Sequence, residues 1–197
     1  MEPRLNLLNH AVCILLALSF LLFESCGNES KPPAAKQVAS RVSAPAFNGD
    51  SAFSYIQKQV DFGPRVPNSA EHIACGDWLA AELKRHGAEV IEQPGRVRAY
   101  DETVLNMRNI IGQFRPQNPE RIMLYAHWDT RPFADKDTIR VREPIDGAND
   151  GGSGVGVLLE VARIIGTDTT LEVGVDVIFF DAEDYGCLLY TSDAADE

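Results

Sequence analysis

Three short segments of the chain concentrate His, Asp and Glu side chains, the residue types that bind metal ions or transfer protons. The first is His127-Trp-Asp129, the second places Asp150 in a glycine-rich run, and the third is the acidic segment 181–184. His127 and Asp129 are two residues apart, so an extended backbone would direct both side chains to one face. A His beside a carboxylate can be a metal ligand, with the carboxylate as its neighbour at the metal or as the group that orients the His.

Each segment also has a simpler interpretation. His127 alone could be a structural histidine, Asp150 alone a helix cap, and Glu183-Asp184 alone a solvated loop. Adjacent acids are costly to bury as unpaired charges, and a shared cation is one way to hold them. Three such segments at strand ends or a helix start favour a metal site, and one His with carboxylates suits zinc.

The surrounding pattern predicts an α/β sandwich with a largely buried sheet. Two short apolar runs, Arg121–Ala126 and Val173–Phe180, are expected to be buried strands, and each ends at one of the chemical segments. Because the carboxyl ends of such strands converge on one crevice, the segments are expected to meet there. The remaining elements are expected to be helices at 51–60, 68–86 (begun by Asn68 with Glu71 as a capping box) and 152–165, and strands at 89–100, interrupted at Pro94-Gly95, and 105–114.

Other catalytic motifs do not fit the glycine-rich run. Gly151-Gly-Ser-Gly154 has Val155 where a nucleophile elbow needs glycine. The glycines do not have the dinucleotide-binding spacing, and no Lys follows as in a phosphate-binding loop.

Composition limits the partners. The 197 residues include 18 Lys+Arg against 29 Asp+Glu, a net charge of -11, which argues against nucleic-acid binding. Four cysteines are too few for a disulfide framework, and nothing indicates that Cys75 and Cys187 pair.

The N-terminal 50 residues are expected to lie outside the folded domain. Residues 1–25 form a signal peptide with an apolar core at 11–23, too short for a typical membrane span. Ser25-Cys26-Gly27 resembles a bacterial lipoprotein box, which predicts a lipid anchor at Cys26 and a tether over 26–50. The alternatives to a lipid anchor are an ordinary cleaved signal peptide and an uncleaved membrane anchor. The expected location is the periplasmic or outer side of a bacterial membrane.

The C-terminal residues 187–197 break the α/β pattern. They resemble a translated sequencing adapter and are expected to be non-native; a real short ending is the alternative. The folded part would then be residues 51–186.

The segments His127-Trp-Asp-Thr-Arg131, Gly147–Gly154 and Phe179–Gly186 resemble the zinc aminopeptidase superfamily, and more closely its bacterial glutaminyl-peptide cyclotransferases. Phe62-Gly-Pro-Arg-Val-Pro67 and the stretch 100–111 are also similar to that group. The resemblance implies a three-layer α/β sandwich with a central mixed, largely parallel sheet, incomplete at the C-terminus.

The resemblance also implies roles for individual residues. Asp150 and Asp184 would bind zinc, Glu183 would be the general acid/base, and Asp129 would orient His127. His127 matches the ligand of the second zinc in the aminopeptidases and need not bind metal in a cyclase, so one zinc is expected for a cyclase and two for an aminopeptidase.

The implied reaction converts an N-terminal glutamine of a peptide or protein to pyroglutamate, with release of ammonia. A zinc aminopeptidase of the same fold is the main alternative, and a non-catalytic envelope protein is a third. The family's last zinc ligand is a downstream His, and no His follows Gly186. The chain as written is therefore expected to be a fragment that binds zinc weakly and has no activity.

Overall fold

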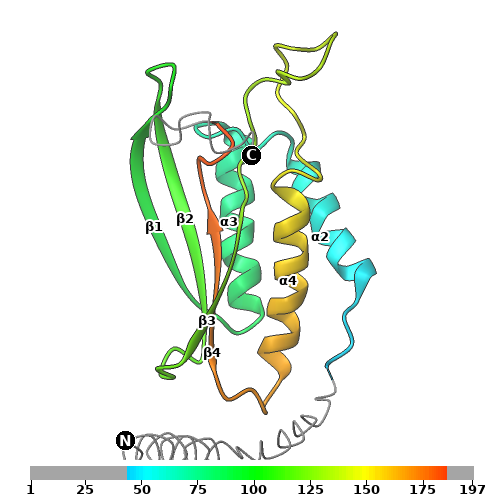
Figure 1. The fold of residues 1–197 in the computed structure, drawn as a ribbon, viewed down its shortest axis with the longest axis vertical. Helices are drawn as coiled ribbons and strands as arrows, with labels where there is room; N and C mark the ends of the chain where they lie inside the picture. The colour runs from blue at the N-terminus through cyan, green and yellow to red at the C-terminus, as the bar shows by residue number, and fades with distance from the viewer. Residues whose placement is uncertain (1–43, 186–197) are drawn as a thin grey trace, which may run out of the picture. The chain divides into compact units, whose positions relative to one another are not determined.

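The computed structural model describes residues 44–185, which form three helices and a four-stranded sheet (Figure 1). The signal peptide, the tether up to residue 43 and the C-terminal residues from 186 lie outside the described residues. Within residues 44–185, no helix is long and apolar enough to cross a membrane. The elements in chain order are α2 (Gly49–Phe62), α3 (Ala70–Arg85), β1 (Glu89–Arg98), β2 (Val104–Phe114), β3 (Arg121–His127), α4 (Gly152–Thr167) and β4 (Gly174–Phe180).

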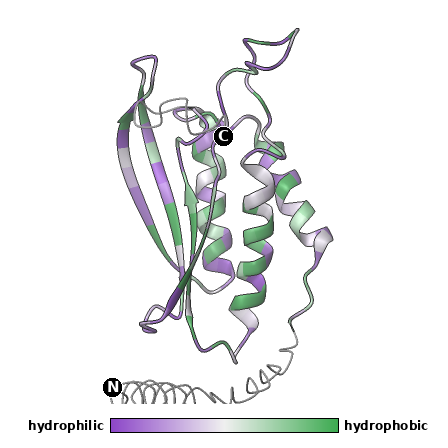
Figure 2. Cartoon of the chain, in the orientation of Figure 1, coloured by the Kyte–Doolittle hydropathy of each residue, from purple (hydrophilic) through white to green (hydrophobic). Residues whose placement is uncertain are grey.

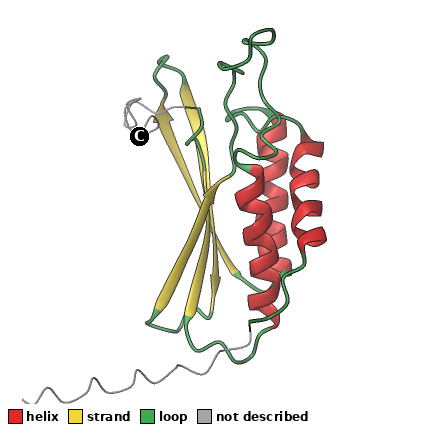
Figure 3. Cartoon of the chain, turned by 45° about the vertical axis from the view of Figure 1, so that its right-hand side comes forward, coloured by secondary structure: helices red, strands yellow, loops and turns green. Residues whose placement is uncertain are grey.

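The sheet is mixed, with the strand order β1-β2-β4-β3. β1 pairs with β2 and β2 with β4 in antiparallel fashion, whereas β3 and β4 are parallel. The predicted α/β class is confirmed, although among the described strands only one pair is parallel. All three helices lie on the same side of this sheet (Figure 3).

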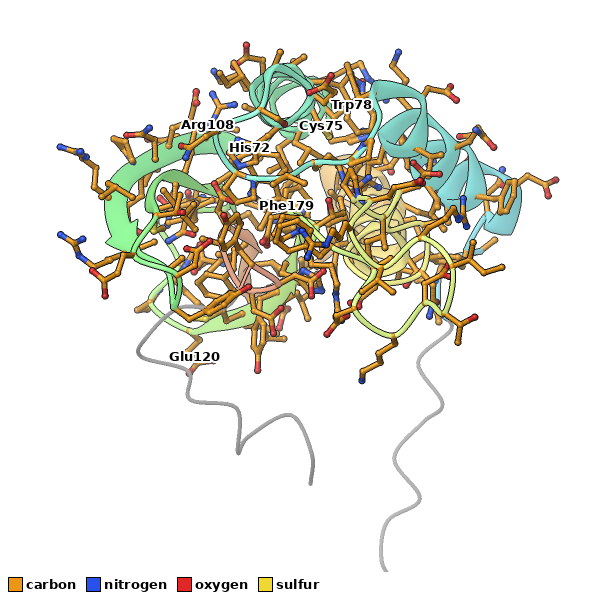
Figure 4. All side chains as sticks on the ribbon, turned by 90° about the horizontal axis from the view of Figure 1, so that it is seen from above. His72, Cys75, Trp78, Arg108, Glu120 and Phe179 are labelled. Atoms are coloured by element: carbon orange, nitrogen blue, oxygen red, sulfur yellow. The ribbon has the colours of Figure 1, made fainter. Side chains whose placement is uncertain are left out.

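The core lies between the helices and one face of the sheet. β4 contributes Val175, Val177 and Phe179, and α3 contributes Leu79 and Leu83. Figure 4 places Phe179 near the centre of the molecule. α4 carries hydrophobic residues along most of its length (Figure 2), and its Val155 and Leu159 are fully buried in the same cluster.

The small residues at the start of α4 permit close packing. A Cβ on Gly154 would lie 2.9 Å from the Cβ of Ala126 in β3. A Cβ on Gly156 would lie 2.8 Å from the carbonyl oxygen of Ala52 in α2. Side chains at these positions would therefore force the helix away from its neighbours.

β3 differs from its prediction as a buried strand. It lies at the edge of the described sheet, and on it Met123 and Tyr125 are 59% and 67% exposed. An apolar run cannot by itself distinguish a central strand from an edge strand, because both the pairing and the cover on each face are tertiary features. β4, the other predicted buried strand, is buried between β2 and β3.

Three local predictions are corrected. Ser69, not Asn68, caps α3 by accepting a hydrogen bond from the His72 N–H, while Asn68 adopts φ 77° and its side chain binds the backbone of β2. β1 runs without a break through Pro94-Gly95, which an edge strand tolerates because one row of its backbone groups has no ladder partner. α2 begins at Gly49, capped by Asn48.

Candidate active site

The three chemical segments meet at one end of the molecule. β3 and β4 run parallel, with His127 opposite Phe180, so the segments that follow them leave the sheet side by side. The N-terminus of α4 lies at the same end, together with the long loop that precedes it (Figure 1). This arrangement brings His127, Asp129, Asp150, Glu183 and Asp184 into one cluster.

Asp150 faces the cluster and does not cap α4. The N-cap residue of α4 is Gly151, which makes no side-chain cap hydrogen bond. One Asp150 oxygen lies 3.2 Å from the Nε2 of His127, and the other lies 3.2 Å from an Nη of Arg131. The helix-cap interpretation of Asp150 is therefore excluded, and its carboxylate is available at the site.

Asp129 is completely buried and holds the backbone of the third segment. Its two oxygens accept hydrogen bonds from the N–H groups of Glu183 and Asp184, at 3.2 and 3.1 Å. The Nδ1 of His127 lies 3.6 Å from the Asp129 carboxylate. Burial raises the pKa of Asp129. Asp129 thus contacts the acidic segment as well as His127, whereas sequence spacing alone connects it only to His127.

His127 lies among carboxylates. Its Nδ1 is 3.7 Å from Glu183 and is a buried atom without a hydrogen-bond partner among the described residues. Burial alone would lower the pKa of His127, but the negative charges of Asp129, Glu183 and Asp150 outweigh it and raise the pKa to about 9. The carboxylates around His127 therefore favour its protonated form.

Glu183 has the environment of a proton-transfer group. Its side chain is 57% exposed. Partial burial raises the pKa of Glu183, and the nearby carboxylates of Asp129, Asp184 and Asp150 raise it further against the opposing effect of His127. A carboxylate with a raised pKa is a better general base near neutrality.

Asp184 is the most enclosed of the predicted ligands, with a side chain 6% exposed. Its oxygens contact Arg131 twice, at the backbone N–H (2.9 Å) and at an Nη (2.7 Å). The same Nη is the one bound by Asp150. Two carboxylates from different segments thus converge on a single positive group.

The convergence of these carboxylates on Arg131 shows that they can share one positive charge. One oxygen of Asp150 and one of Asp184 contact the same Nη, and the Nε2 of His127 lies 3.2 Å from the other Asp150 oxygen. Carboxylate oxygen and imidazole nitrogen are ligands that zinc accepts. Among residues 44–185, however, no three His, Cys, Asp or Glu side chains are placed to complete a shell around an ion.

Arg65 supports the site, although its residue type and spacing in the sequence do not indicate this role. Its side chain is fully buried and donates hydrogen bonds to the carbonyl oxygens of Trp128, Asp146 and Gly147, at 3.1, 2.6 and 2.8 Å. These carbonyls belong to the first and second chemical segments, so one guanidinium joins them. Only its place in the Phe62–Pro67 motif could have pointed to it.

The glycine at 147 serves this arrangement. Gly147 has φ 58°, and a Cβ there would lie 2.2 Å from the Thr130 side chain and 2.8 Å from Arg65. The close approach that Gly147 permits is therefore between parts of the protein itself.

A second set of contacts supports the acidic segment 181–184. The His72 ring donates to Asp181 at 2.9 Å and stacks on Trp128 with the ring centroids 4.3 Å apart. Asp181 also accepts a hydrogen bond from the Arg108 N–H. Figure 4 shows His72 on α3, near Arg108. His72 and Asp181 are 109 residues apart in the chain, so no local sequence pattern predicts this contact.

Comparison with known proteins finds similarity to zinc-dependent enzymes. Residues 109–193 match the family model for peptidase family M28. A solved glutaminyl cyclase from Bacteroides thetaiotaomicron is 52% identical, with a TM-score of 0.71 over 77% of this chain and 52% of that one. A Zn-dependent exopeptidase from Parabacteroides distasonis is 56% identical, with a TM-score of 0.71 over 77% and 54%. Aminopeptidase YwaD of Bacillus subtilis is 36% identical over 54% of this chain and 22% of its own length.

The chain spans about half the length of these solved structures and a third or less of the curated relatives that it matches. The described residues have the zinc exopeptidase-like fold of the bacterial glutaminyl cyclases, as the sequence motifs predict.

Proposed function

We propose, from the relationship of this chain to the bacterial glutaminyl cyclases and Zn-dependent exopeptidases, that a protein carrying this sequence is a zinc-dependent glutaminyl cyclase. The observation that carries the proposal is the convergence of Asp150 and Asp184 on one cationic position, with Glu183 adjacent to Asp184 in the chain and its pKa raised. The 52% identity to a solved glutaminyl cyclase supports the choice of reaction.

In the proposed mechanism, Asp150 and Asp184 would hold the metal, and His127 would be available to it only as the neutral imidazole. Zinc bound there would act as a Lewis acid on the side-chain carbonyl of an N-terminal glutamine. Glu183 accepts a proton from the attacking α-amine and returns a proton to the departing ammonia, so the net change is lactam formation with loss of ammonia. Asp129 fixes the backbone of Glu183 and Asp184 during these transfers.

The second candidate is a zinc aminopeptidase, and the short distance between His127 and Asp150 favours it. The Nε2 of His127 lies 3.2 Å from an Asp150 oxygen, so both could serve neighbouring ions. In that reaction Glu183 would deprotonate an attacking water instead of an amine. We propose one zinc ion if the protein is a cyclase and two if it is an aminopeptidase.

The test replaces the matching half of the Bacteroides thetaiotaomicron glutaminyl cyclase with residues 51–186 and assays the chimera beside the unaltered 197-residue chain. With a glutaminyl peptide, the chimera is expected to release ammonia and leave pyroglutamate, and E183Q in the chimera to abolish this. Release of a free amino acid would favour the aminopeptidase. A folded chimera that releases neither product would contradict both reactions.

The unaltered chain is expected to bind zinc weakly and to release no ammonia, because the described residues supply only part of a zinc shell. Metal analysis after dialysis and an ammonia assay measure this. Stoichiometric zinc with full activity would overturn the expectation.

We also propose that the chain is exported and anchored by lipid at Cys26. The apolar run at 11–23 followed by Ser25-Cys26-Gly27 supports this.

A further inference from the structure

Arg131 occupies the position between the two proposed zinc ligands. One of its Nη atoms is 3.2 Å from an Asp150 oxygen and 2.7 Å from an Asp184 oxygen. The other contacts Asp135 at 3.0 Å. Asp150 and Asp184 come from different segments of the chain, so Arg131 joins the glycine-rich run to the acidic segment.

The chemistry of this contact resembles that of a bound cation. Both carboxylates are paired with positive charge, and Asp184, whose side chain is 6% exposed, would otherwise be a nearly buried anion. Hydrogen bonds between charged groups are stronger than those between neutral groups, so the guanidinium competes with a metal ion for these oxygens. Asp150 is 49% exposed, which leaves one side of the pair open to solvent and to an incoming ion.

Arg131 has an ion-pair partner besides the two proposed ligands. This partner is Asp135, which is 62% exposed and lies four residues along the same loop. The Nε of Arg131 has no hydrogen-bond partner among residues 44–185, so the contact with the two proposed ligands is not locked by a further bond at that atom.

We propose that the Arg131 guanidinium is an internal counter-cation that holds Asp150 and Asp184 together in the metal-free protein and must move aside when zinc binds. The proposal rests on the proposed function for its metal. It predicts two separable effects: Arg131 stabilises the metal-free protein, and it weakens zinc binding by competition and by charge repulsion.

The first experiment needs no zinc. Thermal unfolding of the 197-residue chain in chelator is measured for wild type, R131Q, D184N and the double variant. R131Q is expected to lower Tm because it leaves Asp184 nearly buried without its cation. D184N is expected to cost less in the R131Q background than in wild type. Additive changes in Tm would overturn the counter-cation role.

The second experiment titrates zinc against a chelating dye. R131Q is expected to bind zinc about tenfold more tightly than wild type, since the competing charged contacts are removed. R131K, which keeps the charge but not the two-pronged geometry, is expected to fall between them. R140Q is the matched control, because Arg140 lies on the same loop and its only ion pair is with Asp137 at 3.7 Å among the described residues.

The outcomes separate this inference from the proposed function. If wild type binds zinc and D150N does not, the metal site stands; an unchanged or weaker affinity in R131Q would then overturn the competition alone. If neither wild type nor R131Q binds zinc, both the metal site in this chain and the competition are contradicted.

Discussion

At the scale of single residues, the pairing of negative with positive side chains determines how the site is arranged. Asp150, Glu183 and Asp184 carry three negative charges, and His127 and Arg131 supply the positive charges that hold them. Asp129 differs from the others because its oxygens are used by backbone N–H groups. The same residue types therefore have separate tasks, which their sequence positions alone do not distinguish.

His127 provides a prediction about pH. In the metal-free chain its pKa is expected to be about 9, compared with 6.5 for an ordinary histidine. Because the folded pKa is raised, the protonated ring stabilises the fold fully below the ordinary value, and this stabilisation is lost as pH rises through the folded pKa. NMR titration of the His127 ring measures the midpoint. E183Q is expected to lower it by about half a unit, since one nearby negative charge is removed.

The matched control for that titration is E120Q, which removes one carboxylate at the start of β3 on the opposite end of the strand. It is expected to leave the His127 midpoint unchanged. A wild-type midpoint near 6.5 would show that the surrounding carboxylates do not act on His127 as the distances indicate.

At the scale of elements, the loops of the site depend on buried groups from α2, α3 and the loop between them. Arg65 joins the first two segments, and His72 braces the third through Asp181. On the opposite side of α4, the fully buried Glu160 accepts hydrogen bonds from the Asn48 N–H and from Arg163, and so links α4 to the start of α2. The site is thus held by contacts between elements distant in sequence.

R65M is expected to destabilise the chain by about 3 kcal/mol, because it leaves three carbonyl oxygens without their donor. R65K keeps the charge but cannot reach all three, so it should lie between wild type and R65M. Urea unfolding measures the differences. R96Q, at an exposed position of β1, is the control and should change stability by less than about 0.5 kcal/mol. Equal stability of R65M and R96Q would contradict the bracing role.

Glu160 gives a second pH dependence at this scale. Its hydrogen bonds with Arg163 lower its pKa below 4.5. A lowered folded pKa means that the stabilisation is present above the ordinary value and is lost as pH falls through the folded value. Wild type is therefore expected to lose its advantage over E160Q, about 1 to 2 kcal/mol at pH 7, on acidification. Urea midpoints at pH 7 and pH 3 measure this; a constant difference would rule it out.

At the scale of the whole molecule, helices cover one face of the sheet and the edge strand β3 carries exposed apolar side chains. The chain spans about half the length of its solved relatives, and among residues 44–185 no three His, Cys, Asp or Glu side chains are placed to hold a metal ion. Cys75, the described cysteine, is buried, and burial raises the pKa of its thiol to about 12, which makes it unreactive at neutral pH.

Membrane attachment is the prediction at this scale. Expressed in a bacterium, the chain is expected to sediment with membranes, and C26A is expected to release most of it into the soluble fraction because the lipidated thiol is gone. C75A is the control, since Cys75 is buried in the folded domain. Membrane attachment that persists in C26A would indicate an uncleaved anchor, and wild type in the soluble fraction would indicate an ordinary cleaved signal.

The sequence by itself determined the α/β class, the places of the strands and helices, and the three segments of the site. It could do so because strand ends, helix periodicity and residue chemistry are local. Only the tertiary structure decided that β3 lies at the edge of the described sheet, that Asp129 holds the backbone of Glu183 and Asp184, and that Arg65 and Arg131 join separate segments. Those facts depend on which distant groups meet in space, and a guanidinium that satisfies three carbonyls or bridges two carboxylates leaves no periodic signal in the chain.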